Sequence, residues 1–169
     1  RPFKQVGRKA SKDLAVRQVS PEDWRDWRLM RQRSLSEDPS AFSSSTTMWA
    51  GPNDTEERWR ARLADGACFI AYEDGAPVGM VAGMSGEDGN QLISMWVAPG
   101  VRRRGIGAAL INAVIGWNEG QPLRLRVIDG NTSAISAYVR DGFAMLEGSI
   151  DDEGCRTMVW YQARREALR

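Results

Sequence analysis

The feature that most constrains this sequence is a basic, glycine-bearing turn between an alternating apolar run and a helix-like run. Residues 92–97 alternate as in a strand, and apolar residues recur at helical spacing from Ile106 onward. The first N–H groups of a helix have no partner inside it and carry partial positive charge. Gly105 and Gly107 bring no Cβ, so an anion can approach this backbone closely. The stretch therefore predicts a strand, a turn and a helix N-terminus suited to a phosphate or pyrophosphate.

Three consecutive arginines in the turn add formal positive charge; they are Arg102, Arg103 and Arg104. The letters alone fit an anion site, and they also fit a solvated arginine run with ordinary turn glycines. Two common nucleotide-binding motifs are not supported. No Gly-Lys-Ser/Thr follows the glycines, as a Walker loop requires, and Leu110 stands where the dinucleotide fingerprint needs its third glycine.

Composition narrows the class of protein. A chain of 169 residues with 42% hydrophobic residues favours one domain with a real core. The formal net charge is +1, whereas a dedicated nucleic-acid binder needs an excess of basic residues, so we expect no nucleic-acid partner. The alternative is a nucleic-acid binder that uses the three arginines of the turn. No apolar run reaches membrane-spanning length, so no membrane partner is expected.

Histidine is absent from the sequence, which excludes Ser-His-Asp and Cys-His catalysis and the usual zinc sites. Cys68 and Cys155 lie far apart without metal-binding spacing, so we expect no metal. Free cysteines of this kind favour a reducing, cytoplasmic setting.

The order of apolar periods along the chain predicts an α+β domain with a mixed, mainly antiparallel sheet flanked by helices. The expected order is β-α-α-β-β-β-α-β-α-β-β. Expected strands cover 14–19, 68–72, 77–84, 91–97, 123–127, 143–146 and 156–160, and expected helices begin near 21, 54, 106 and 131. Residues 1–13 read as a mobile tail, 14–162 as the domain and 163–169 as a charged tail.

Two blocks of the sequence resemble the signature of the GCN5-related N-acetyltransferases. The first is Arg102-x-x-Gly105-x-Gly107, and the second is Asn131-x-x-Ala134-x-x-x-Tyr138-x-x-x-Gly142-Phe143. The resemblance implies the same element order and acetyl-coenzyme A as cosubstrate. It also implies transfer of the acetyl group from the thioester to a primary amine by direct attack.

The resemblance also implies roles for individual residues. In the family, the strand before the turn diverges from the next strand, and the pantetheine arm lies in the gap. The residues expected to contact the cosubstrate are Met95, Trp96, Val97, Arg102, Arg103, Arg104, Gly105, Ile106, Gly107, Ala108 and Asn131. The Val97 N–H is the expected donor to the thioester carbonyl, and Tyr138 the expected general acid for the departing thiolate. Asn131 can equally be a helix N-cap, and Tyr138 a core tyrosine.

The general base must be a carboxylate or a chain of water, because no histidine exists. Glu87 is the candidate base, since it lies just before the strand that enters the site; Asp88 and Glu37 are further carboxylates near such positions. The acceptor is expected to be a small-molecule amine or a protein amine. Acids of the 151–153 turn and the segment after the first helix are expected to select it.

A second class of function remains open at this point, which is a non-catalytic module that binds or senses acyl-coenzyme A. Such a module would keep the turn and lack turnover with any amine. Family members are often dimers, so a homodimer is possible, although no interface is visible in the sequence.

Overall fold

The computed structural model describes residues 13–42, 46–148 and 150–162. Its helices are α1 (Trp24–Glu37), α2 (Glu56–Ala64), α3 (Ile106–Trp117) and α4 (Thr132–Arg140). Its strands are β1 (Leu14–Val19), β2 (Ala67–Glu73), β3 (Ala76–Gly86), β4 (Gly89–Val97), β5 (Leu123–Ile128), β6 (Ala144–Met145) and β7 (Cys155–Trp160). Short 3-10 turns precede α1, divide the α1–α2 connection and follow β4. The expected tails lie outside the described residues, apart from Asp13.

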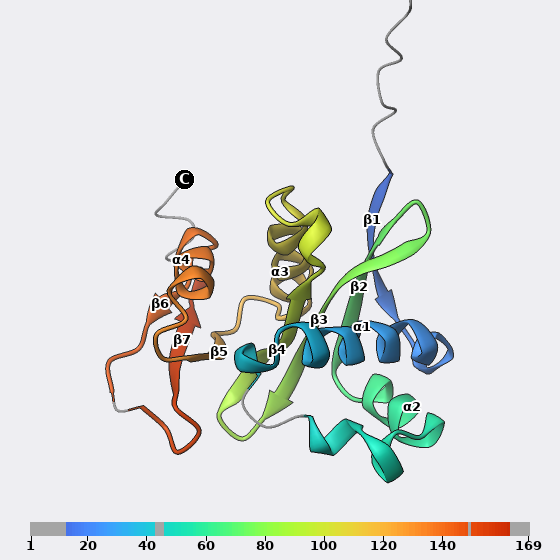
Figure 1. The fold of residues 1–169 in the computed structure, drawn as a ribbon. Helices are drawn as coiled ribbons and strands as arrows, with labels where there is room; N and C mark the ends of the chain where they lie inside the picture. The colour runs from blue at the N-terminus through green and yellow to red at the C-terminus, as the bar shows by residue number, and fades with distance from the viewer. Residues whose placement is uncertain (1–12, 43–45, 149, 163–169) are drawn as a thin grey trace, which may run out of the picture.

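One seven-stranded sheet in the order β1-β2-β3-β4-β5-β7-β6 organises these elements. Its neighbouring strands are antiparallel except for β4 and β5, which are parallel. The predicted fold class, a mixed and mainly antiparallel sheet flanked by helices, is therefore confirmed (Figure 1). None of the helices among the described residues is long and apolar enough to cross a membrane.

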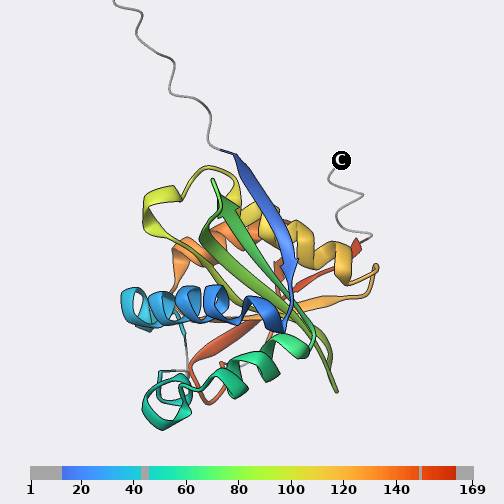
Figure 2. The same ribbon diagram turned by 90° about the vertical axis from the view of Figure 1, so that its right-hand side faces the viewer.

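Two hydrophobic clusters form the core, one on each face of the sheet. Helices α1 and α2 cover one face of the sheet (Figure 2). There Trp27 and Trp59 are fully buried in the same cluster as alternate residues of β2. Helices α3 and α4 cover the other face, where Leu110 packs with residues of β5 and β7. Every residue of β2 is buried because it is covered from both sides.

The α1–α2 connection touches the α1 face of this core. Trp49 of this connection stacks on Trp59 of α2, with ring centroids 4.2 Å apart. Asp54, just before α2, accepts hydrogen bonds from Arg28, Gln32 and the Trp59 indole. The connection is therefore tied to α1 on one side and to α2 on the other.

The parallel junction between β4 and β5 is short. It pairs Asn90 with Leu123 and Gln91 with Arg124, and no later residue of β4 pairs with a described residue of β5. A β-bulge in β4 follows, where Ser94 adopts a left-handed conformation at φ +56° and the register with β3 shifts. Because bulges bend a strand and increase its twist, the two strands diverge beyond this point.

Candidate active site

Three pockets lie along the divergence of β4 and β5, and Met95 and Ala134 line all of them. The α3 pocket, of 340 Å³, lies between the start of α3 and the inner side of α4. The loop pocket, of 670 Å³, lies between residues 38–42 and the β5–α4 loop. The gap pocket, of 130 Å³, lies between the two strands themselves. Because they share these lining residues, we treat the three pockets as one cleft along the opened sheet.

The N-terminus of α3 forms one wall of the α3 pocket. Gly105 is its N-cap residue, at φ +82°, a conformation that favours glycine, and no side chain caps the helix. The first helical hydrogen bond runs from the Ala109 N–H to the Gly105 carbonyl, at 3.1 Å. The amides of Ile106, Gly107 and Ala108 therefore have no partner within the helix and are available to an anion. All three residues line the α3 pocket, and their contact with a cosubstrate stays a prediction.

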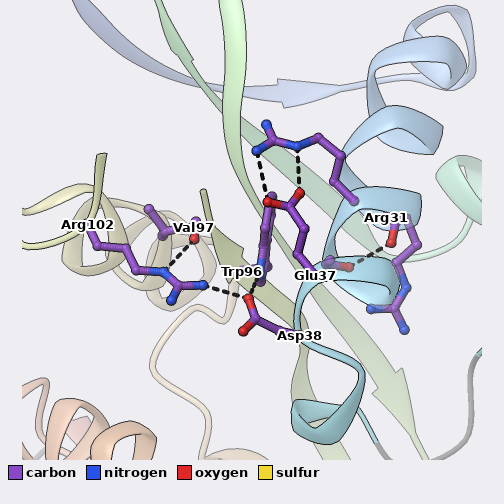
Figure 3. Close-up of polar contacts among 8 residues, drawn as sticks. Arg31, Glu37, Asp38, Trp96, Val97 and Arg102 are labelled. Carbon is purple, nitrogen blue, oxygen red and sulfur yellow. Dashed lines mark hydrogen bonds and ion pairs between the residues drawn. The ribbon is translucent and has the colours of Figure 1, made fainter. Parts of the chain in front are cut away.

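The three arginines of the turn have three different environments. Arg102 donates from Nε to the Val97 carbonyl (2.9 Å) and from Nη2 to Asp38 (2.7 Å), as Figure 3 shows. Arg104 forms an ion pair of 2.6 Å with Glu73, whose side chain is buried at the end of β2. Arg103 is exposed, has a left-handed backbone at φ +63° and forms no ion pair with a described residue. The charge that remains available for a ligand therefore belongs to Arg103.

The end of β4 presents one amide to the cleft. The Ala98 N–H donates to the Val78 carbonyl of β3 at 2.9 Å. Since successive residues of a strand point their N–H groups to opposite edges, the Val97 N–H points away from β3 and toward the gap. Trp96 is buried in the α1 core, and its indole N–H donates to Asp38 at 2.7 Å. The Val97 N–H thus faces the gap, whereas Trp96 anchors the strand and also lines the loop pocket.

Asn131 is the N-cap of α4 and also lines the loop and gap pockets. Its side-chain oxygen accepts from the Ala134 N–H at 3.3 Å. Because an amide side chain also carries an NH₂ group, this bond leaves two donors for the cleft. The capping role and the cosubstrate-contact role are therefore compatible.

Tyr138 lies on α4 and lines both the α3 pocket and the gap pocket. Its ring packs edge-to-face on Phe143, with centroids 5.9 Å apart. Its hydroxyl has no hydrogen-bond partner among the described residues. Loss of water around the hydroxyl, with a smaller contribution from the nearby Asp141 charge, raises the pKa of Tyr138 to about 12. The Tyr138 ring thus packs against the core, and the residue also lines the cleft.

The candidate base Glu87 lies in the exposed turn between β3 and β4 and lines none of the three pockets. Val97, the expected donor to the thioester carbonyl, lies at the other end of β4. At about 3.3 Å per residue, the strand from Gly89 to Val97 is roughly 26 Å long. Asp88 shares that turn, and Glu37 is held by Arg33 at 2.9 Å. The structure therefore does not bring Glu87 to the cleft.

Two other carboxylates, Asp38 and Asp129, line the loop pocket, and no catalytic motif in the sequence identifies them. The hydrogen bond from Trp96, with that from Arg102, holds the pKa of Asp38 below its ordinary value. Asp38 therefore stays charged near neutral pH and is a poor proton acceptor. The acidic 151–153 turn, expected to select the acceptor, lines none of the pockets; its Asp151 is engaged by Arg126 at 2.8 Å.

Among the described residues, no group of three or more His, Cys, Asp or Glu side chains could hold a metal ion. The structure therefore offers no support for a metal-dependent reaction from these residues, and the expectation of no metal stays a prediction. The hydrogen-bond donors along the cleft include backbone amides, the Asn131 amide and the Arg103 guanidinium, while the carboxylates Asp38 and Asp129 lie on its loop-pocket side. The donors are suited to a ligand with a phosphate end and a carbonyl group.

Comparisons with known proteins agree with this geometry. The model of the acetyltransferase (GNAT) family matches residues 23–143. The peptidyl-lysine N-acetyltransferase YiaC of Escherichia coli (strain K12) is 32% identical over 136 residues, which are 74% of this chain and 89% of the relative.

Solved structures show the same fold at low sequence identity. The PaiA N-acetyltransferase of Thermoplasma acidophilum, in complex with coenzyme A, superposes with a TM-score of 0.72 and 17% identity, covering 88% of this chain and 99% of that one. A ribosomal-protein-alanine N-acetyltransferase of Brucella melitensis has a TM-score of 0.69 and 19% identity, covering 87% and 99%.

Proposed function

The chain belongs to the GNAT family of acetyltransferases and is an N-acetyltransferase, and from this premise we propose that it moves the acetyl group of acetyl-coenzyme A to a lysine side chain of a peptide or protein. The observation that carries the proposal is the opened junction between β4 and β5. The uncapped N-terminus of α3 lies beside that opening. A phosphate end and a thioester end of one ligand would thus meet donors at both places.

The start of α3 is proposed to hold the pyrophosphate. Three amides without helical partners supply partial positive charge, and Arg103 supplies a formal one. Gly107 leaves room for close approach: a Cβ there would lie 3.3 Å from the Met95 side chain and 3.9 Å from Val97, in the α3 pocket. Acetyl-coenzyme A would supply the activated acetyl group.

The chemistry is proposed to centre on Val97 and Tyr138. The Val97 N–H, which points into the gap, is placed to donate to the thioester carbonyl as negative charge develops on its oxygen. The Tyr138 hydroxyl is placed to donate to the departing thiolate. The NH₂ group of Asn131 is placed to donate to the amide groups of the pantetheine arm. Holding both substrates in one cleft can itself supply ~7–11 kcal/mol of the barrier.

The proton of the attacking amine is proposed to leave through water. Of the carboxylates in the loop pocket, Asp38 is already committed to Trp96 and Arg102, and its lowered pKa disfavours proton uptake. The loop pocket, at 670 Å³, is large enough for several ordered waters beside the acceptor. A water chain can then carry the proton to bulk solvent without a dedicated base.

Two observations support lysine as the acceptor: the activity of the relative from Escherichia coli and the residues that line the loop pocket. The relative from Escherichia coli is a peptidyl-lysine N-acetyltransferase. In this chain, Phe42 and Ala41 give the loop pocket an apolar wall, while Asp38 and Asp129 give it negative charge. A long apolar stem that ends in a cationic amine, as in lysine, matches such a lining.

The test is an acetyl-transfer assay that separates the two kinds of protein amine. Purified protein is incubated with acetyl-coenzyme A and with peptides that carry either a free lysine and a blocked N-terminus or a free N-terminus and no lysine. We expect thiol release and acetyl incorporation with the lysine peptide. Transfer only to the N-terminal amine would overturn the acceptor class, and no transfer to either peptide would overturn the proposed function.

A further inference from the structure

Asp38 connects the end of α1 to the end of β4 through a compact set of hydrogen bonds. A single carboxylate oxygen, Oδ2, accepts from the Trp96 indole at 2.7 Å and from the Arg102 guanidinium at 2.7 Å. The same guanidinium donates from Nε to the Val97 carbonyl at 2.9 Å. Figure 3 shows the carboxylate of Asp38 between the two donors. We call these three hydrogen bonds the Asp38 clamp.

The clamp acts on the part of β4 that lacks support from the sheet. Beyond Gln91, the β5-facing edge of β4 has no ladder partner in the described part of β5, and the bulge at Ser94 interrupts the register with β3. A strand end with one free edge is mobile unless other groups hold it. The clamp holds it on both sides of Val97, at the Trp96 side chain before it and at the Val97 carbonyl after it.

The clamp contacts are strong enough to fix a strand end. Both bonds to Oδ2 are short, and the bond from Arg102 is charge-assisted, a class about twice as strong as neutral hydrogen bonds. Arg102 Nε and Nη2 form a planar fork, which restrains the direction of the guanidinium as well as its distance. The Asp38 side chain is only 33% exposed, so water competes less for these bonds than on an open surface.

We propose that Asp38 is a positioning residue for acetyl transfer: through Trp96 and Arg102 it fixes the peptide groups on both sides of Val97, and so aims the Val97 N–H into the cleft. The inference rests on the proposed function, in which that N–H donates to the thioester carbonyl. It gives the side chain of Arg102 a task different from anion binding. That task is to link the acceptor-side segment 38–42 to the turn at the start of α3.

The kinetic test breaks the clamp by substituting Asp38 or Arg102 and measures kcat. In Asp38→Ala and in Arg102→Gln we expect kcat to fall about 10- to 100-fold, since a displacement of about 1 Å in the reacting geometry can cost 10²-fold. The affinity for coenzyme A, measured by calorimetry, should change less than about threefold in Asp38→Ala, because the α3 amides are untouched. Asp38→Asn, which keeps an acceptor oxygen, should recover part of kcat. The double variant should lose no more than the larger single loss, because the two residues act as one unit.

The matched control is Glu56→Gln, which breaks an exposed ion pair with Arg60 on α2, away from the cleft. It should leave kcat and coenzyme A affinity unchanged. Unchanged kcat in Asp38→Ala, or losses that multiply in the double variant, would overturn the positioning role.

A measurement without catalysis separates the clamp from the proposed function. In ¹⁵N-labelled wild-type protein, the Arg102 Nε–H and Trp96 Nε1–H signals should exchange slowly with water, and Asp38→Ala should accelerate both by at least about tenfold. Unchanged exchange would overturn the clamp even if the enzyme were active. Conversely, slow exchange of both N–H groups in a protein that acetylates no amine would overturn the proposed function. The hydrogen bonds of the clamp would then be present, but their role in positioning Val97 for acetyl transfer would be overturned as well.

Discussion

Replacement of Tyr138 by phenylalanine removes only the hydroxyl that is proposed to donate to the departing thiolate. The ring contact with Phe143 survives in Tyr138→Phe, and the lost hydroxyl has no hydrogen-bond partner among the described residues. We therefore expect the free energy of unfolding to change by less than ~0.5 kcal/mol, as for a substitution that removes no buried contact. The effect should fall on turnover alone.

The size of that effect follows from the pKa of the donor. The pKa of Tyr138 is raised to about 12, whereas an alkyl thiol like that of cysteine has a pKa of about 8.5. Full proton transfer from the phenol to the thiolate is therefore uphill by roughly 5 kcal/mol. Tyr138 should act mainly by hydrogen-bond donation as charge develops, so we expect kcat to fall about 10²-fold, the low end of the ~10²–10⁴ range for general acids.

The assay follows thiol release at saturating acetyl-coenzyme A and lysine peptide, with Tyr161→Phe as control because Tyr161 is an exposed tyrosine that lines none of the three pockets. Since the raised pKa keeps the phenol protonated, kcat of the wild type should show no loss from Tyr138 between pH 7 and about pH 10. Unchanged kcat in Tyr138→Phe would refute the role. A fall confined to coenzyme A affinity would refute it as well, because it would make Tyr138 a binding residue only.

Two further predictions concern stability. Asp54→Ala should cost about 1–3 kcal/mol in denaturant unfolding, because it leaves the fully buried Trp59 indole N–H without its acceptor. The hydrogen bonds that Asp54 accepts, above all from Arg28, hold the pKa of Asp54 well below its ordinary value. The charged carboxylate therefore contributes to the free energy of unfolding above about pH 4, and this contribution is lost as the pH falls toward the folded-state pKa. Stability that is flat from pH 5 to pH 2 would contradict the assignment. Gly66→Ala should cost more than about 2 kcal/mol, because a Cβ there would clash with the Gly83 carbonyl oxygen in addition to the left-handed strain at φ +65°. Gly75→Ala is the control, since it shares the strain at φ +81° but meets nothing within 4 Å; equal losses would show that the clash is relieved elsewhere.

The elements with strong local signals were predictable from the sequence. The Asp74-Gly75 pair between the expected strands 68–72 and 77–84 is typical of a hairpin turn, and both residues adopt the left-handed conformation that such a turn needs. The alternating run before Val97 predicted β4, and the helical period from Ile106 predicted α3. These signals are local because hydrogen bonding and side-chain periodicity within each element decide them.

The contacts that connect distant elements were not predictable from the sequence. Nothing around Asp38 indicates a partner 64 residues later, yet its carboxylate meets Arg102. Similarly, Glu87 precedes the strand that enters the site, but the sequence does not show that the turn before β4 lies outside the pockets that Leu92 and later residues of β4 line. The bulge at Ser94 also lacks a glycine that would mark a left-handed residue in the sequence.

The central claim, that the start of α3 and the opened β4–β5 junction hold acetyl-coenzyme A, is tested most directly by calorimetric titration of the wild type and of Gly107→Trp. Wild-type protein should bind acetyl-coenzyme A saturably, with weaker binding of adenosine nucleotides that lack the pantetheine arm. An indole at residue 107 would fill the α3 pocket, so Gly107→Trp should bind at least about 100-fold more weakly while its thermal unfolding stays cooperative. Unchanged affinity in the folded variant would contradict the placement of the ligand and the mechanism built on it.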